Sequence, residues 1–129
     1  MIFARRVFTV AGVWGLLVMT PMYFTEAKTG RDYPPEITHP EFYYGFVGVV
    51  LAFQVAFLVL SRDPVRYRGM MIPSILEKVG FAVAMPILFL QHRIPAAVFG
   101  FSMVDLLFAV LFIAAYVKTA GVEKNQSRG

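Results

Sequence analysis

Several ingredients of common enzyme sites are missing from this sequence. It contains no cysteine, which excludes disulfides, thiolate metal ligands and thiol nucleophiles. Charged residues make up only 16% of the 129 residues, and there are two histidines. No serine-histidine-aspartate order, phosphate-binding glycine loop or His-x-x-x-His spacing occurs, so no catalytic set and no metal site is expected. The sequence therefore predicts a protein that is not an enzyme.

Apolar residues, in contrast, are abundant. Hydrophobic residues account for 58% of the chain and the mean hydropathy is +0.66, which is well above the composition of a water-soluble domain. The net charge of +4 does not indicate a nucleic-acid partner, because the basic residues are spread between apolar segments and form no patch with interleaved aromatic rings. This composition favours a lipid bilayer as the environment of the chain.

Four apolar segments are each close to the length of a membrane-spanning helix. A hydrocarbon core about 30 Å thick is crossed by roughly 20 helical residues. The turns between the last three segments are short, so these segments must be antiparallel neighbours. We predict an all-α polytopic membrane protein, a single domain over 1–129 with four transmembrane helices in an antiparallel bundle. The predicted spans are 7–24, 42–60, 70–91 and 95–117, followed by a polar C-terminal tail, 118–129.

Lysines and arginines are distributed unequally between the predicted loops. Eight lie in the N-terminus, the loop 61–69 and the tail, whereas three lie in the loop 25–41 and the turn 91–94. Because cytoplasmic loops carry the excess of positive charge, both termini are predicted to be cytoplasmic. The arginine pair near the start is interpreted as the flank of a retained first helix, because no small-x-small cleavage site follows it.

The longest loop, 25–41, is expected to end where the second span begins. Thr38 and Glu41 have the spacing of a capping box, and Pro40 between them suits the first turn of a helix. Aromatic residues flank the loop and would form a belt at the membrane surface; they are Tyr23, Phe24, Phe42, Tyr43 and Tyr44.

Three ionisable side chains and one amide lie inside the predicted spans. They are Gln54, Glu77, Lys78 and Asp105, and a rise of roughly 1.5 Å per residue puts them within about one helical turn of one another in height. Charged groups in hydrocarbon are costly, so these residues are the first functional candidates. One interpretation is a proton-carrying or cation-binding pair of Glu77 and Asp105, with Gln54 as a hydrogen-bond partner. The alternative is a polar link between helices through Gln54, Ser102 or Lys78, and the sequence leaves both open.

The two neighbouring charges on the third span are expected to face different environments, because consecutive helical residues point about 100° apart. Glu77 shares a stripe with Gly80 and Ala84, which predicts that Glu77 faces the bundle. Lys78 is interpreted as an interfacial anchor whose aliphatic stem extends to the headgroups. Asp105 lies near the middle of its span and must be paired, hydrogen-bonded or protonated.

His39, His92 and Trp14 are weaker candidates for cofactor binding. Histidine is a common ligand of haem and chlorophyll, but both histidines flank the spans, where surface or capping roles are expected. Trp14 lies mid-span, which predicts a ring packed in the protein core, with stacking on a cofactor or lipid as the alternative. The sequence requires no cofactor, and it leaves peripheral contacts with lipid, quinone or chlorophyll open.

The overall layout resembles that of small bacterial four-helix inner-membrane proteins of the DoxX-like type. The features that carry the resemblance are four short-looped spans and a last span that contains VDLLFAVLF at 104–112. The name-giving members of that group are associated with quinol-linked oxidoreductase complexes. The resemblance implies a bacterial inner (cytoplasmic) membrane location and a subunit role.

Two functions are predicted from these features. The first is a non-catalytic integral membrane subunit of a larger respiratory or photosynthetic electron-transfer complex, which stabilises or links subunits, lipids or pigments. The second is a small carrier, a proton pathway or a quinone- or lipid-binding protein centred on the intramembrane acids. The expected partners are membrane lipids, other integral membrane subunits and, in a homo-oligomer, further copies of the chain.

Overall fold

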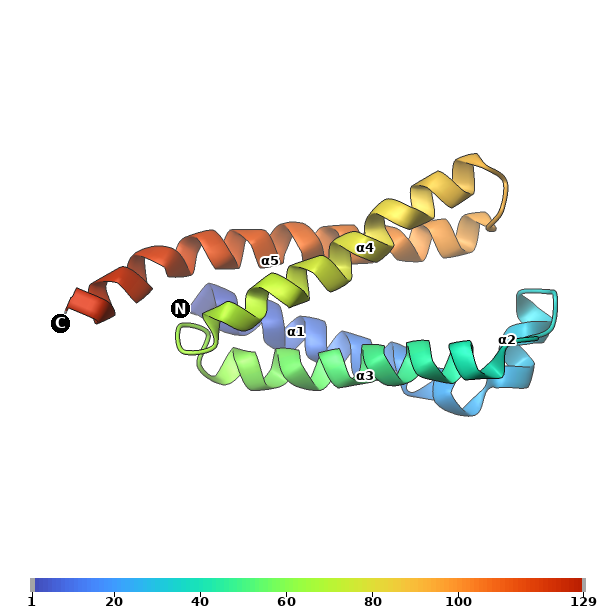
Figure 1. The fold of residues 1–129 in the computed structure, drawn as a ribbon, viewed down its shortest axis with the longest axis horizontal. Helices are drawn as coiled ribbons and strands as arrows, with labels where there is room; N and C mark the ends of the chain where they lie inside the picture. The colour runs from blue at the N-terminus through green and yellow to red at the C-terminus, as the bar shows by residue number, and fades with distance from the viewer. Residues whose placement is uncertain (1, 129) are drawn as a thin grey trace. The chain divides into compact units, whose positions relative to one another are not determined.

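The fold is built from helices. A computed structural model describes the backbone of residues 2–128 and the side chains of residues 2–122, and Figure 1 shows it as a ribbon. The described residues form no strand. The elements are α1 (Ile2–Met19), the 3-10 helix η1 (Pro21–Phe24), α2 (Glu26–Asp32), α3 (Pro40–Arg62), the 3-10 helix η2 (Arg68–Met70), α4 (Met71–Leu90) and α5 (Ala96–Arg128).

Four helical segments are long and apolar enough to cross a membrane. At roughly 1.5 Å per residue, each one exceeds the thickness of a hydrocarbon core of about 30 Å. The predicted all-α class with four such helices is therefore confirmed. The segments are Ile2–Phe24, Pro40–Arg62, Arg68–Leu90 and Ala96–Val122.

Helix α5 continues beyond the end of the predicted last span. The sequence indicated a polar tail after residue 117, whereas α5 has 33 residues and ends at Arg128. Residues 118–128 contain no proline and several good helix formers, so a change to polar composition does not end the helix. At roughly 1.5 Å per residue α5 is about 50 Å long, which is about 20 Å more than the hydrocarbon core requires.

The chain divides into two compact units. Unit 1 comprises Met1–Phe8 and Leu60–Gly129, and unit 2 comprises Thr9–Val59. The sequence indicated one domain over 1–129 and contained no signal for this division.

In unit 1, α4 and α5 run antiparallel along one another (Figure 1). Near the turn that joins them, the rings of Phe89 and Phe99 stack with centroids 4.6 Å apart. At the other end of the pair, the Arg68 Nε donates a hydrogen bond of 3.0 Å to the Thr119 Oγ1. The contacts therefore follow the whole length of α4, as expected for helices joined by a short turn.

The first turns of α1 also belong to unit 1. The ring of Phe8 stacks on that of Phe112 from α5, with centroids 4.3 Å apart. Both rings are fully buried, as are Leu60 and Met71. These four large side chains belong to the apolar core of unit 1.

In unit 2, the rest of α1 packs closely against α3. A Cβ added at Gly12 would lie 2.8 Å from the Leu58 Cδ2 and 2.9 Å from the backbone oxygen of Gln54. A Cβ added at Gly15 would overlap the Gln54 carboxamide. Two glycines therefore allow the α1 and α3 backbones to approach, as small residues do at interfaces between transmembrane helices.

The predicted loop 25–41 contains a helix that the sequence did not indicate. Helix α2 has seven residues, and it is tied to the start of α3 by tyrosines of the predicted aromatic belt. The Tyr44 hydroxyl donates a 3.0 Å hydrogen bond to the Glu26 Oε2, and the Tyr43 hydroxyl donates to the backbone oxygen of Met22. Tyr23 packs edge-on against Tyr44, with centroids 5.3 Å apart. These aromatic residues therefore hold the α2 segment in place.

The predicted capping box at the start of α3 is wrong by one residue. Helix α3 begins at Pro40, and the backbone oxygen of His39 accepts a 3.0 Å hydrogen bond from the Phe42 N–H. His39 is therefore the N-cap, and Glu41 occupies the second helical position instead of the third. Its carboxylate lies 3.2 Å from the His39 Nδ1. Proline shifts the helix start because its fixed φ suits the first helical position.

Candidate functional site

The candidate site in unit 1 is a buried lysine between two carboxylates. The Lys78 Nζ lies 3.3 Å from the Asp105 Oδ1 and 3.6 Å from the Glu77 Oε2. Lys78 as a residue is only 4% exposed. Its ammonium also lies 5.7 Å from the centroid of the Phe108 ring, close enough for a weak cation–π contact. The charged group therefore sits between α4 and α5 and joins the two helices.

The orientation predicted for Lys78 on α4 is wrong. The buried face of the helix consists of Met71, Ser74, Lys78 and Ala82, which recur at helical spacing. Gly80, from the stripe predicted to face the bundle, is exposed. Lys78 thus points into the protein and is not an interfacial anchor. Its carboxylate partner on α5 compensates the cost of burying the ammonium, which the sequence of α4 alone could not reveal.

Glu77 and Lys78 nevertheless share one environment, contrary to the prediction from helical spacing. The Glu77 side chain is 16% exposed and that of Asp105 is 22% exposed. The long stem of Lys78 carries its ammonium to a point that both carboxylates can approach. With both carboxylates ionised the group would carry one excess negative charge, and a single bound proton would neutralise it. The arrangement can therefore link two helices, and it can also bind and release a proton.

Gln54, the fourth predicted member, makes its described contacts within unit 2. It is fully buried on α3, and its Nε2 donates a 2.9 Å hydrogen bond to the backbone oxygen of Val50. Its Oε1 has no hydrogen-bond partner among the described residues. The carboxamide lies against Gly15 of α1. Of the four predicted residues, the structure brings Glu77, Lys78 and Asp105 together in unit 1.

The weaker candidates lie at the surface. Trp14 is 41% exposed, so the prediction of a packed core tryptophan is wrong. The buried side of this part of α1 carries Ala11, Gly12 and Gly15, and the two glycines lie so close to α3 that an indole ring would not fit at their positions. His39 is the N-cap of α3 and its ring stacks on that of Phe42, with centroids 5.1 Å apart.

His92 ends α4 in a conformation that is unusual for a residue with a side chain. Its φ is +56°, in the left-handed region that glycine usually occupies after a helix. The His92 N–H donates a 3.0 Å hydrogen bond to the Phe89 oxygen, and the Arg93 N–H donates one of 2.9 Å to the Leu88 oxygen. This pair of bonds is a Schellman motif, so His92 has a helix-ending role.

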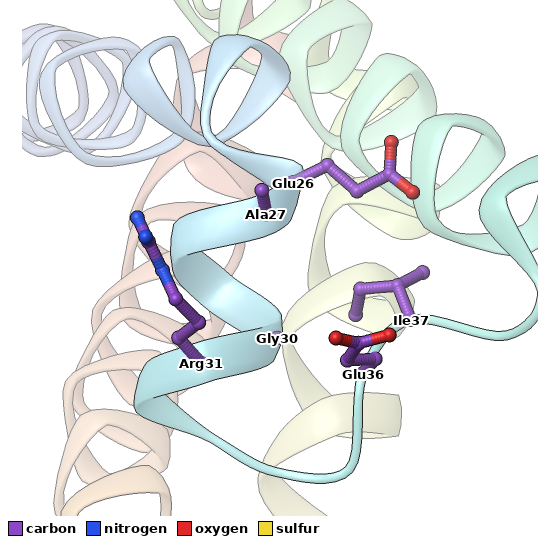
Figure 2. Close-up of a pocket in the computed structure, with 6 residues that line it drawn as sticks. All are labelled: Glu26, Ala27, Gly30, Arg31, Glu36 and Ile37. Atoms are coloured by element: carbon purple, nitrogen blue, oxygen red, sulfur yellow. The ribbon is translucent and has the colours of Figure 1, made fainter.

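An open pocket in unit 2 was not predicted. Figure 2 shows Glu26 and Glu36 on the same side of α2 and Arg31 on the other. A Cβ added at Gly30 would lie 3.2 Å from the Glu36 Cα and the Ile37 N, so the chain after α2 folds back closely onto it. Among the described residues, no three histidine, cysteine or acidic side chains are close enough to hold a metal ion. The pocket is lined by Glu26, Ala27, Gly30, Arg31, Glu36 and Ile37.

A second polar contact of unit 1 was also missed in the sequence. The Arg68 Nη2 donates a 2.9 Å hydrogen bond to the Tyr116 backbone oxygen, and its guanidinium carbon lies 3.7 Å from the centroid of the Tyr116 ring. Thr119, fully buried, accepts a hydrogen bond from Arg68 through its hydroxyl. The available signals in the sequence were Arg68, two residues before the predicted third span, and Thr119, two residues after the end of the predicted last span.

The comparisons with known proteins give no family for this chain. No family model, curated protein or solved structure matches it. The class that the fold defines is thus a helical protein with four segments of membrane-spanning length and a buried charged group in one unit. The resemblance to DoxX-like proteins stays a prediction.

Proposed function

We propose that the protein is a non-catalytic integral membrane subunit that stabilises or links other components of a larger membrane complex. The observation that supports this function is that the charged side chains within the predicted spans pair with one another between two helices. The Lys78 ammonium lies within 3.6 Å of a carboxylate on its own helix and 3.3 Å of one on α5. A buried ion pair between two helices determines how they pack, which is a structural use of charge.

The outer faces of α4 and α5 support the same proposal. Apolar side chains more than half exposed follow both helices; they are Leu76, Val83, Ile87, Leu90, Phe101, Leu107, Val110 and Val117. Surfaces of this kind suit hydrocarbon chains and the apolar faces of other transmembrane helices. The proposed location is a bacterial inner membrane with both termini in the cytoplasm, on the basis of the lysine and arginine distribution.

The proposed complex is of the respiratory or photosynthetic electron-transfer type. Support for this choice comes from the layout shared with DoxX-like proteins. Quinone, chlorophyll and lipid are the proposed peripheral contacts, and further copies of the chain are an additional partner. Trp14, exposed at mid-span, is one ring that such a molecule could touch.

Isolation from native membranes in a mild detergent tests the subunit role. The expected result is a particle well above the 14.5 kDa of the chain plus its detergent, with other integral membrane chains present in fixed ratio. Absorption spectra and extraction of quinones from the same particle identify any chromophore. A particle with the mass of a lone chain plus detergent contradicts the proposal.

A second function, a small carrier or proton pathway, is favoured by one specific observation. Two carboxylates share one ammonium, and the Glu77 Oε2 is buried without a hydrogen-bond partner among the described residues. A group with one carboxylate in excess can take up a proton without leaving a net charge in the membrane. Glu77 and Asp105 would then be the proton-binding residues.

Proton uptake into proteoliposomes distinguishes the two functions. For a carrier, Asp105→Asn should abolish uptake measured with an internal pH-sensitive dye, while Asp63→Asn, which changes an exposed acid outside the candidate site, should leave it intact. For a structural subunit, the wild-type chain should give the same rate as empty liposomes. Uptake that survives Asp105→Asn contradicts the carrier function.

A further inference from the structure

Exposed basic side chains gather at one end of unit 1. They come from the first turns of α1, the end of α3, the turn before η2 and the far part of α5. Asp63 is the exposed acid among the described side chains of this unit. Five positive charges and one negative charge leave a net of four positive charges. The basic residues, here called the basic rim, are Arg5, Arg6, Arg62, Arg66 and Lys118.

Contacts with α5 show that the start of α1 and the turn before η2 both lie near Lys118. The Lys118 Nζ lies 4.0 Å from the centroid of the Phe3 ring, so the start of α1 lies beside this part of α5. The Arg68 guanidinium is bound to the Tyr116 oxygen and the Thr119 hydroxyl at 2.9 and 3.0 Å. The turn between α3 and η2 therefore ends within one helical turn of Lys118.

The basic rim borders directly on exposed apolar surface. Ile2 precedes Arg5 by less than one helical turn, and Val117 is adjacent to Lys118; both are about two-thirds exposed, at 66% and 65%. Met70 and Ile72, which follow the turn that carries Arg66, are also exposed. Basic and apolar side chains thus lie within a few residues of one another at this end.

We propose that the basic rim binds anionic phospholipids. The guanidinium groups hold the phosphate, because their forked N–H donors match its oxygens, and the acyl chains lie against Ile2, Met70, Ile72 and Val117. A phospholipid supplies an anion and hydrocarbon in one molecule, which matches cations that border on apolar side chains, whereas a soluble polyanion would match the cations alone. This inference concerns lipid at the protein surface and does not depend on the proposed subunit role.

The charge of the rim also predicts a preference among anionic lipids. A headgroup with one phosphodiester neutralises one of the four net positive charges, and a headgroup with two phosphates neutralises two. Diphosphatidylglycerol should therefore bind more tightly than phosphatidylglycerol. Both interactions should weaken as salt is added, because exposed charges are screened.

Native mass spectrometry of the full chain in neutral detergent tests the proposal. The probes are diphosphatidylglycerol, phosphatidylglycerol, phosphatidylcholine and inorganic phosphate. The expected result is that both anionic lipids bind at concentrations at least about tenfold lower than phosphatidylcholine, and inorganic phosphate binds far more weakly. Equal binding of phosphatidylcholine overturns the proposal, and so does tight binding of inorganic phosphate, which would indicate a site for a soluble anion.

Matched triple variants locate the site. R5Q/R6Q/R66Q removes three rim charges and should weaken binding of diphosphatidylglycerol at least about tenfold, whereas K28Q/R31Q/R93Q removes three charges elsewhere and should not. Equal weakening in both variants overturns the assignment. R5K/R6K/R66K keeps the charge but lacks the forked donors, so it should bind diphosphatidylglycerol more tightly than R5Q/R6Q/R66Q and less tightly than wild type. If R5Q/R6Q/R66Q loses its helical circular dichroism signal, the test is the salt dependence of diphosphatidylglycerol binding to the wild-type chain. Binding that does not weaken as salt is added overturns the proposal.

Discussion

The two units of this protein hold their helices together in different ways. In unit 1, Lys78 of α4 and Asp105 of α5 form an ion pair between the helices. In unit 2, Gly12 and Gly15 let the backbone of α1 approach α3. Lipid solvates apolar side chains as well as another helix does, so burial of leucine or valine alone drives little association inside a bilayer. A polar link and close backbone packing are two solutions to that problem.

The difference lies in what each solution costs when it fails. A buried charge that loses its partner is left uncompensated, and this penalty is large. A close contact that is widened loses dispersion energy, and the helices can separate slightly to relieve the strain. We therefore expect unit 1 to be sensitive to charge and unit 2 to be sensitive to volume.

The largest effect is expected from Lys78→Met. Two carboxylates would remain without their ammonium, and breaking a buried pair in this way costs about 3–5 kcal/mol of stability. The loss should be smaller at low pH, where protonated carboxyls leave no uncompensated charge. Unfolding in mixed micelles, followed by circular dichroism, measures it. The triple variant Lys78→Met/Glu77→Gln/Asp105→Asn should recover most of the lost stability. If Lys78→Met alone is as stable as wild type at neutral pH, the ion pair does not have this role.

The next largest effect is expected from Gly12→Val in unit 2. The added side chain would meet the Gln54 backbone oxygen at 2.9 Å from its Cβ, and overpacking of this kind costs about 1–3 kcal/mol. Gly48→Val is the matched control, because a Cβ at Gly48 has no atom within 4 Å among the described contacts and should change stability by about 0.5 kcal/mol or less. The same unfolding assay applies. Equal losses at the two positions would show that close approach of α1 and α3 is unimportant.

A smaller effect of opposite sign is expected from His92→Gly in unit 1. The φ of +56° at this position favours glycine, so the substitution should increase stability by about 1 kcal/mol without touching any charge. His92→Ala removes the same imidazole but keeps the Cβ, and it should give no such increase. If alanine stabilises as much as glycine, the gain arises from loss of the ring and not from the backbone.

The smallest effect is expected from Gln54→Leu. The buried Oε1 has no hydrogen-bond partner among the described residues, so replacing the carboxamide by an apolar side chain of similar shape should change stability by about 1 kcal/mol or less. Gln54→Ala instead opens a cavity, and a loss of about 2 kcal/mol is expected. A Leu substitution that destabilises as strongly as Lys78→Met would remove the distinction drawn between the two units.

The sequence predicted which residues lie at similar depth but not which way they face. Rise per residue put Gln54, Glu77, Lys78 and Asp105 within about one helical turn of one another in height, and the structure brings the last three together. The direction of Lys78 was predicted wrongly, because snorkelling and pairing are both open to a lysine until the position of Asp105 on the neighbouring helix is known. Trp14 was also assigned to the wrong side, since in a membrane protein an apolar side chain does not indicate the interior.

The sequence predicted the ends of helices less well than their existence. Hydropathy located the spans, but α2 within the loop 25–41 was missed because its seven polar and small residues have no apolar face of their own. It is held by the Tyr43 and Tyr44 hydroxyl groups, which reach it from α3. The continuation of α5 past residue 117 was missed because hydropathy marks the end of an apolar span, whereas residues 118–128 contain no proline and several good helix formers and therefore do not end the helix.

By itself the sequence determined that this chain forms four apolar helices, because backbone hydrogen bonds within a helix and the length of a hydrocarbon core are local requirements that roughly 20 consecutive residues satisfy. Only the tertiary structure decided that Lys78 is buried against Asp105 and that α3 packs closely against Gly12 and Gly15. Those outcomes depend on which side chain a second helix presents at the same height. The free energy of an ion pair or of a close packing contact depends on both partners, so it cannot be assigned to either residue alone.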